Sequence, residues 1–164
     1  MKNLVFLMFF AAIIASLFIS CAKNTKTGLT HEQKVAIQNE VIDQNNKLIS
    51  ADNQLNTDLW SEFWSKDGFL SVTSGVNYFD NRSVLIDSVT NWFSRRASQK
   101  IEPIDIRVTP LTPELALLTA KSNLEILFKN ENQYKWEVLV TVLWKKEQTG
   151  WKAIHMHESY ARIN

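Results

Sequence analysis

The sequence predicts an α+β domain in which N-terminal helices pack on a strongly curved antiparallel sheet that forms a cone. Helical periodicity dominates the chain from residue 30 to residue 96, and long strands joined by short turns fill the last third. Long strands twist too strongly to stay flat, so the sheet should curl around the helices and leave a cavity. With 164 residues, 45% of them hydrophobic, the chain can form one domain with its own core.

The first 20 residues have the anatomy of a secretory signal peptide. Lys2 precedes an apolar run over residues 4–15, and the small residue Ser20 stands directly before Cys21, the single cysteine. The segment 17–21 resembles the lipobox of bacterial lipoproteins. This resemblance implies cleavage before Cys21, lipidation of its thiol, and a membrane anchor in the cell envelope, facing the periplasm or the outside. The alternatives are an uncleaved anchor helix, or an ordinary signal in which the cysteine is incidental.

We therefore divide the chain into a signal peptide (residues 1–20), a tether (residues 21–29) and a folded domain (residues 30–164). Cleavage removes Lys2, one of 18 basic residues, and no acidic residue, so 17 acidic side chains balance the remaining basic ones. A neutral domain has no electrostatic reason to bind nucleic acid, so we expect no nucleic-acid partner.

The first predicted helix is long and amphipathic. Thr30 and Gln33 form a capping box at its start, and its apolar seam continues to about Asn53. Asn45 and Asp52 interrupt this seam, so they either face a cavity or mark the edge of the seam.

The remaining elements follow from apolar spacing and from turn residues. They are a helix over 57–65, strands over 69–74 and 76–79, a helix over 83–96, and strands over 104–109, 114–128, 134–146 and 151–160. Pro103 and Pro110 limit the strand between them, because proline cannot donate to a strand ladder. Trp60, Trp64 and Trp92 lie at helical spacing and pack in the core or line the cavity.

The C-terminal hairpin carries a family resemblance. Its sequence, VTVLWKKEQTGWKAIHMHESY, ends one strand at Trp144 and continues after a turn with Trp151, His155 and His157. Together with FWSKDGFLSVTSG at 63–75, it resembles SnoaL-like domains of the nuclear transport factor 2-like superfamily, including the association domain of calcium/calmodulin-dependent protein kinase II. The resemblance implies the cone-shaped cystatin-like fold and a homodimer. The family includes enzymes, binding modules and oligomerisation domains, so it leaves the reaction open.

The two histidines are the sharpest chemical feature. His155 and His157 alternate along one strand, so their side chains share a face. With Glu137 or Tyr78 they are candidates for acid–base catalysis or for the polar end of the cavity, although hydrogen-bonded structural histidines would show the same pattern. Only His31 could join them, far away, and two ligands do not complete a catalytic zinc site, so we expect no metal and no cofactor.

The face that the histidines occupy depends on the preceding turn. If residues 147–150 form a four-residue loop, the histidines share a face with Trp136 and Trp144. If the loop covers only 148–150, they share a face with Glu137 and Thr141. The sequence leaves both registers open.

Three functions remain compatible with the sequence. The first is a module that binds a small, largely apolar molecule or acts as a dimeric interaction domain. The second is a cofactor-free isomerase, cyclase or dehydratase with a histidine or carboxylate base, and the third is an oligomerisation scaffold. The ligand-binding candidates are aromatic or polar residues of the predicted helices and strands: Trp60, Trp64, Tyr78, Trp92, Arg107, Asn123, Glu125, His155 and His157.

Overall fold

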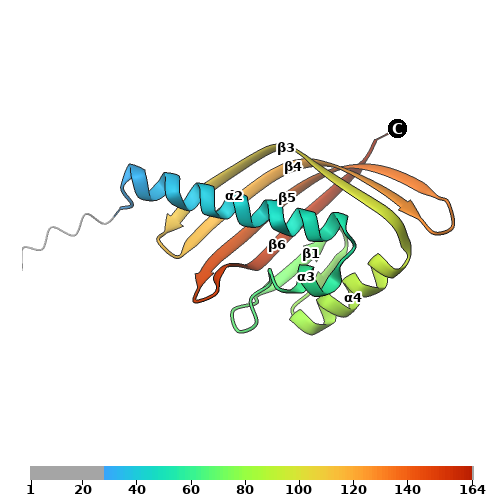
Figure 1. Ribbon diagram of the computed structural model, residues 1–164, viewed down its shortest axis with the longest axis horizontal. Coiled ribbons are helices and arrows are strands. Elements are labelled where there is room, and N and C mark those ends of the chain that lie inside the picture. The colour runs from blue at the N-terminus through green and yellow to red at the C-terminus, as the bar shows by residue number, and fades with distance from the viewer. Residues whose placement is uncertain (1–27, 164) are drawn as a thin grey trace, which may run out of the picture.

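The computed structural model describes residues 28–163, so the predicted signal peptide, Cys21 and most of the predicted tether lie outside the described residues. Figure 1 shows an α+β fold in which helix α2 lies across one face of a curved sheet. The predicted fold class is confirmed. The elements are α2 (His31–Asn53), α3 (Thr57–Ser61), β1 (Ser71–Ser74), β2 (Asn77–Phe79), α4 (Arg82–Ser94), β3 (Arg96–Thr112), β4 (Leu115–Phe128), β5 (Gln133–Glu147) and β6 (Gly150–Arg162).

The sheet has six strands in the order β2-β1-β6-β5-β4-β3. The four long strands β3 to β6 form an antiparallel meander, as predicted, while β1 pairs in parallel with β6. The predicted capping box is present, because the Thr30 side chain accepts from the Gln33 amide while the Gln33 side chain accepts from the Thr30 amide. This cap fixes where α2 begins.

Strand β3 is far longer than the predicted strand over 104–109. Pro103 and Pro110 each stand at a register shift against β4, and β3 is the edge strand of the sheet. An edge strand tolerates proline at bulges because the missing N–H costs no ladder hydrogen bond there. The strand therefore runs through both prolines and begins at Arg96, directly after α4.

The second and third helices end earlier than predicted. Residues 63–65 were expected in the second helix, but they run alongside β6: the Ala153 amide donates to the Phe63 carbonyl (2.8 Å) and the Ser65 amide donates to the Ala153 carbonyl (3.0 Å). Helix α4 ends at Ser94 rather than at residue 96. The first difference places Trp64 and Ser65 beside β6, and the second places Arg96 at the start of β3.

A β-bulge at Ile154 decides the register that the sequence left open. The hairpin turn places Lys146 opposite Trp151, which is the register expected for a four-residue loop over residues 147–150. Trp144 accordingly lies opposite Ala153. The bulge then shifts the pairing, so that His155 lies opposite Leu143 and His157 lies opposite Thr141. The histidines thus share a face with Glu137 and Thr141, but a bulge rather than the turn puts them there.

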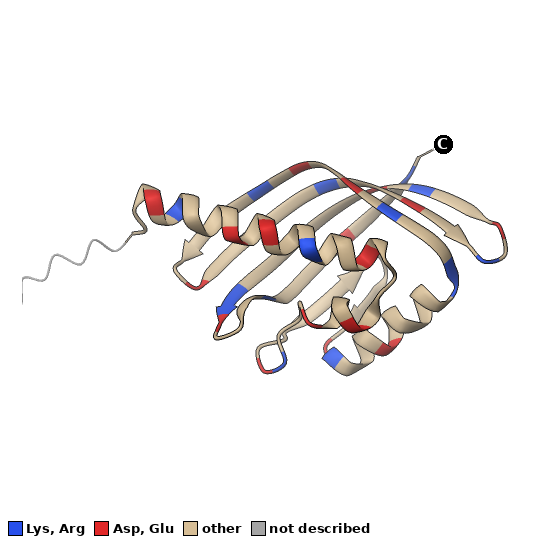
Figure 2. Ribbon diagram, viewed as in Figure 1, with Lys and Arg blue, Asp and Glu red and all other residues tan. Residues whose placement is uncertain are grey.

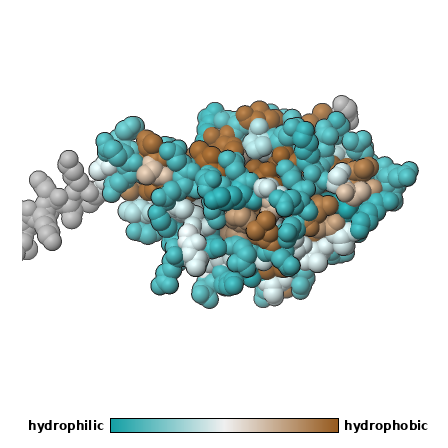
Figure 3. All heavy atoms as spheres, viewed as in Figure 1, coloured by the Kyte–Doolittle hydropathy of each residue, from teal (hydrophilic) through white to brown (hydrophobic). Residues whose placement is uncertain are grey.

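The core lies between the helices and the concave face of the sheet. Its largest fully buried side chains include Trp64, Trp144, Leu85 and Leu118. Acidic and basic residues are interspersed along α2 and the strands (Figure 2), and hydrophobic residues reach the visible surface in patches between hydrophilic ones (Figure 3). Within residues 28–163, no helix combines the length and the apolar character that crossing a bilayer requires.

Candidate functional site

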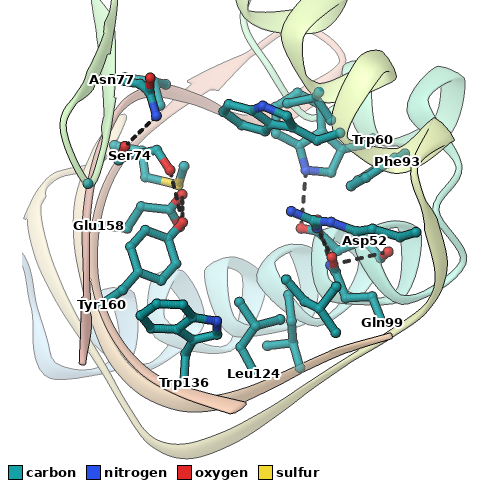
Figure 4. A pocket seen from close by; sticks show the side chains of 18 of the residues that line it. Asp52, Trp60, Ser74, Asn77, Phe93, Gln99, Leu124, Trp136, Glu158 and Tyr160 are labelled. Atoms are coloured by element: carbon teal, nitrogen blue, oxygen red, sulfur yellow. Dashed lines mark hydrogen bonds between the residues drawn. The ribbon is translucent and has the colours of Figure 1, made fainter. Parts of the chain in front are cut away.

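A cavity of about 590 Å3 opens between the helices and the concave face of the sheet (Figure 4). This volume falls within the roughly 300–1,000 Å3 range of small-molecule sites. Strands β4 and β5 contribute Leu124 and Trp136, while α3 contributes Trp60. The lining is mainly aromatic and aliphatic, and its large side chains are Trp60, Trp64, Leu85, Trp92, Phe93, Leu124, Ile126, Phe128, Tyr134, Trp136 and Tyr160.

The first polar cluster of the cavity is centred on Asp52, which lies in the last turn of α2. Its Oδ2 accepts a hydrogen bond from Nε1 of Trp60 (3.1 Å), and its Oδ1 accepts one from Nε2 of Gln99 (3.3 Å). The Gln99 Oε1 in turn accepts from the guanidinium of Arg96, at the start of β3. We call these four residues the Asp52 cluster.

The surroundings of Asp52 disfavour its negative charge. Burial, with a smaller contribution from the negative charge of Glu158, raises the pKa of Asp52 to about 7. The hydrogen bonds from Trp60 and Gln99 and the charge of Arg96 act in the opposite direction and are outweighed. A carboxyl group with a pKa near neutrality can both accept and return a proton at physiological pH.

The second polar cluster, the Glu158 cluster, comprises Ser74, Glu158 and Tyr160. The Tyr160 hydroxyl donates to Oε1 of Glu158 (2.5 Å) and lies 2.9 Å from Oγ of Ser74. Burial raises the pKa of Glu158, although the hydrogen bonds from Tyr160 and Ser74 oppose this shift. Burial and the adjacent Glu158 charge raise the pKa of the Tyr160 hydroxyl, so it remains a hydrogen-bond donor.

The two clusters lie on opposite walls of the cavity, with apolar side chains between them (Figure 4). A bound molecule could therefore place polar atoms at both walls and an apolar body in the middle. Within residues 28–163 there is no group of three His, Cys, Asp or Glu side chains that could hold a metal ion. The polar side chains of the Asp52 and Glu158 clusters can form hydrogen bonds and exchange protons.

The fold agrees with the comparison to known families. A family model described as a SnoaL-like domain matches residues 41–163. The chain belongs to the SnoaL-like domain family. No curated protein matches the chain.

Solved structures similar to this SnoaL-like domain share its fold at low sequence identity. A nuclear transport factor 2-like superfamily protein from Salmonella enterica serovar Typhimurium has a TM-score of 0.70 at 12% identity, covering 76% of this chain and 91% of its own. The hexachlorocyclohexane dehydrochlorinase LinA-type3 from Novosphingobium barchaimii has a TM-score of 0.67 at 9% identity, with coverages of 82% and 94%. The cone-shaped fold inferred from the sequence is thus confirmed.

A third similar structure bears on the predicted resemblance to an association domain. It comes from Xanthomonas campestris and is provisionally assigned as a calcium/calmodulin-dependent protein kinase II association domain. It has a TM-score of 0.65 at 16% identity, covering 74% of this chain and 86% of its own. At such identities these structures establish the fold of the SnoaL-like domain alone.

Three of the four aromatic candidates of the SnoaL-like domain line its cavity. Trp60, Trp64 and Trp92 all line it, and of the two alternatives for Asp52 the structure adopts the cavity-facing one. Tyr78 does not line the cavity: it lies in β2 and is 65% exposed.

The histidines lie on the opposite, outer face of the sheet, which corrects their expected position at the polar end of the cavity. After the bulge, Met156, Glu158 and Tyr160 line the cavity, so His155 and His157 point the other way. Nδ1 of His155 lies 2.9 Å from Oγ of Ser71, and His157 is exposed.

The other polar candidates also lie on the outer face or in exposed ion pairs. Glu137 pairs with Lys121 (2.7 Å), Glu125 with Lys135 (2.7 Å) and Arg107 with Asp105 (3.0 Å). Asn123 stands opposite Glu137 in the β4–β5 ladder. These residues therefore lie outside the cavity: Asn123, Glu125 and Glu137 occupy the strand phase opposite to the lining residues. The register shift between Pro103 and Asp105 puts Arg107 on the outer face.

Sequence reasoning missed Arg96, Gln99, Glu158 and Tyr160. Arg96 was expected at the end of the third helix and Gln99 between that helix and the next strand, while Glu158 and Tyr160 lie in the strand phase opposite to the histidines. The signal that could have found them is the interruption of the α2 seam by Asp52, since a buried carboxyl group requires polar partners on the facing sheet.

Proposed function

We propose that this protein is a lipid-anchored SnoaL-like module of the bacterial envelope that binds a small, largely apolar molecule in the cone cavity. The observation that carries the proposal is the cavity itself, whose aromatic lining is interrupted by two separate polar clusters. Such a lining offers apolar contact area and a small number of orienting hydrogen bonds. The signal-like sequence before Cys21 supports the anchor.

A second function, cofactor-free acid–base catalysis, is favoured by one specific observation. Asp52 faces the cavity with a pKa raised to about 7 by burial, and it is held in place by Trp60 and Gln99. A carboxylate in this state could remove a proton from a bound molecule while Tyr160 donates a hydrogen bond from the opposite wall. Isomerisation, cyclisation and dehydration each require such a proton transfer.

A small-molecule screen tests the binding function. We expect aromatic and branched apolar compounds to raise the melting temperature and to quench tryptophan fluorescence, because several tryptophans line the cavity. Asp52→Asn or Glu158→Gln should change the affinity of such hits about tenfold, the effect of one charged hydrogen bond. The matched control is Asp58→Asn, since Asp58 is exposed in α3. If Asp58→Asn and Asp52→Asn change the affinity of a hit equally, that hit binds outside the cavity.

Turnover of the hits then separates an enzyme from a binding module. If a hit is converted without added cofactor, Asp52→Asn should abolish conversion while the hit still binds. If no hit is converted at any pH between 5 and 9, the binding function stands alone.

A further inference from the structure

The guanidinium of Arg96 is the cation that lines the cavity of the described chain, and it lacks an ion-pair partner. Six ion pairs occur among residues 28–163, and none of them includes Arg96. Its Nη1 donates to Oε1 of Gln99, a neutral acceptor, and its Nε is buried without any acceptor among these residues. A partly buried charge is normally paired by direct contact, so Arg96 lacks a contacting counter-charge, although the charges of Asp52 and Glu158 act on it from a distance.

The nearest acidic groups do not supply this counter-charge by direct contact. Asp52 uses one oxygen for Trp60 and the other for Gln99, while Glu158 is bound to Tyr160 on the opposite wall. The Phe93 ring lies 5.8 Å below the guanidinium and adds a cation–π contact. Nη2, which has no acceptor among residues 28–163, is thus left for a group that enters the cavity.

We propose that the molecule bound in this cavity is an organic carboxylate, with an apolar body against the aromatic wall and its carboxylate on Arg96. This inference rests on the proposed binding function and specifies its ligand class. Guanidinium and carboxylate form strong, planar, charge-assisted hydrogen bonds, and these strengthen where water is excluded. An apolar body fits because Leu124, Trp136 and Trp60 surround the remaining space.

The charge balance of the cavity predicts how pH affects this binding. The titratable or charged groups that face the site are Asp52, Arg96, Tyr134, Glu158 and Tyr160, with Arg95 nearby. Protonation of Asp52 removes a negative charge next to the guanidinium, so an anion should bind more tightly at pH 6 than at pH 8. Asp52→Asn should remove most of this pH dependence, because the amide carries no charge at either pH.

Matched pairs of probes test the ligand class directly. We would measure the affinity of the full-length chain in detergent for 1-naphthoate and 4-phenylbutyrate, each against its neutral primary amide, by isothermal titration calorimetry. The carboxylates should bind at least tenfold more tightly than the amides at pH 6. Arg96→Gln should abolish this preference and bring the affinity of each carboxylate down to about that of its amide, whereas Arg96→Lys should retain part of the preference.

Arg95→Gln is the matched control, since Arg95 is the adjacent arginine and is exposed at the end of α4. It should leave the preference intact, and unchanged melting temperatures of the Arg96 variants would show that they fold. Equal affinity for carboxylate and amide, or equal losses in the Arg95 and Arg96 variants, would overturn the proposed carboxylate ligand while leaving cavity binding in place. If neither the acids nor the amides bind, the proposed binding function fails as well.

Discussion

Asp52 and Glu158 face one cavity from opposite walls, Asp52 from the last turn of α2 and Glu158 from β6 (Figure 4). They are 106 positions apart in the sequence, yet the negative charge of Glu158 raises the pKa of Asp52 across the cavity and that of Tyr160 beside it. Burial raises the pKa of both carboxyl groups. The charged forms of both carboxyl groups are therefore disfavoured in the folded protein, so substitutions and changes of pH should alter its stability.

Asp52→Asn should stabilise the protein at alkaline pH. The folded-state pKa of Asp52, about 7, lies above its ordinary value of 3.8, so the folded state holds the proton more tightly than the unfolded chain does. The contribution of protonated Asp52 to the free energy of unfolding is thus fully present below pH 3.8 and is lost as pH rises through 7. We expect the variant to gain roughly 2–4 kcal/mol in free energy of unfolding at pH 8, at 1.36 kcal/mol per pKa unit, and little at pH 4.

Urea unfolding of the wild type and the variant at pH 4, 6 and 8 measures this difference. Asp58→Asn serves as the control, because Asp58 lies exposed on α3. A gain that is equal at pH 4 and pH 8 would contradict the buried ionisation that we describe. The helix dipole adds to the expected stabilisation by Asp52→Asn at alkaline pH, since a negative charge in the last turn of α2 is unfavourable.

Tyr160→Phe should raise the pKa of Glu158 further. The Tyr160 hydroxyl donates to Oε1 of Glu158, and this bond is the larger of the two hydrogen bonds that lower the pKa of the carboxyl group. Removing the donor leaves burial less opposed. Carbon-detected NMR titration of the Glu158 carboxyl group in both proteins measures the shift, and Tyr134→Phe, another ring in the cavity lining, is the control. An unchanged titration midpoint in Tyr160→Phe would show that this hydrogen bond is absent in solution.

Local signals in the sequence predicted most of the fold. The capping box of Thr30 and Gln33 and the turn before Gly150 each depend on residues close in the chain, and both are present in the structure. The length of β3 did not follow from such signals, because whether Pro103 and Pro110 interrupt a strand depends on the strand being at the edge of the sheet. Strand order is a property of the whole fold.

The site was harder to predict than the fold because a bulge at one residue, Ile154, decides which side chains of β6 face the cavity. A regular β6 would keep His155 and His157 in the same phase as the buried Trp151 and Ala153. The bulge at Ile154 exchanges the two faces and brings Glu158 into the cavity, and nothing in the local composition marks a bulge at this position. The tryptophan candidates Trp60, Trp64 and Trp92 do line the cavity, because helical spacing does not depend on this register.

Adjacent substitutions in β6 should therefore have opposite effects. His157→Gln should change the free energy of unfolding by less than about 0.5 kcal/mol, as for an exposed surface residue, and should leave ligand affinity unchanged. Glu158→Gln should change both quantities, because Glu158 lines the cavity and accepts from Tyr160. His155→Ala should cost about 1 kcal/mol through loss of its contact with Ser71. Loss of ligand binding in His157→Gln but not in Glu158→Gln would show that the ligand binds at the outer face of the sheet instead.

The predicted homodimer can be tested on the outer face of the sheet. Leu139 is 53% exposed there, opposite Lys121 and Ser159. We expect residues 23–164 to sediment at twice the monomer mass, and Leu139→Glu to shift the protein toward monomer because a buried charge opposes association. Val76→Glu is the control, since Val76 is fully exposed in the turn between β1 and β2. A monomer at tens of micromolar wild-type protein would refute the dimer.

Cys21→Ser should abolish the proposed lipid anchor. The apolar run, the small residue Ser20 and the cysteine coincide at the expected cleavage point, and a lipidated thiol would supply the anchor, since each buried CH2 of an acyl chain contributes about 0.8 kcal/mol. Serine provides no thiol for lipidation, so the variant should be found in the soluble envelope fraction or remain as an unprocessed precursor. Fractionation, with mass spectrometry of the N-terminus, distinguishes these products. A variant that remains in the membrane fraction and is still cut before residue 21 would show that the anchor does not depend on Cys21.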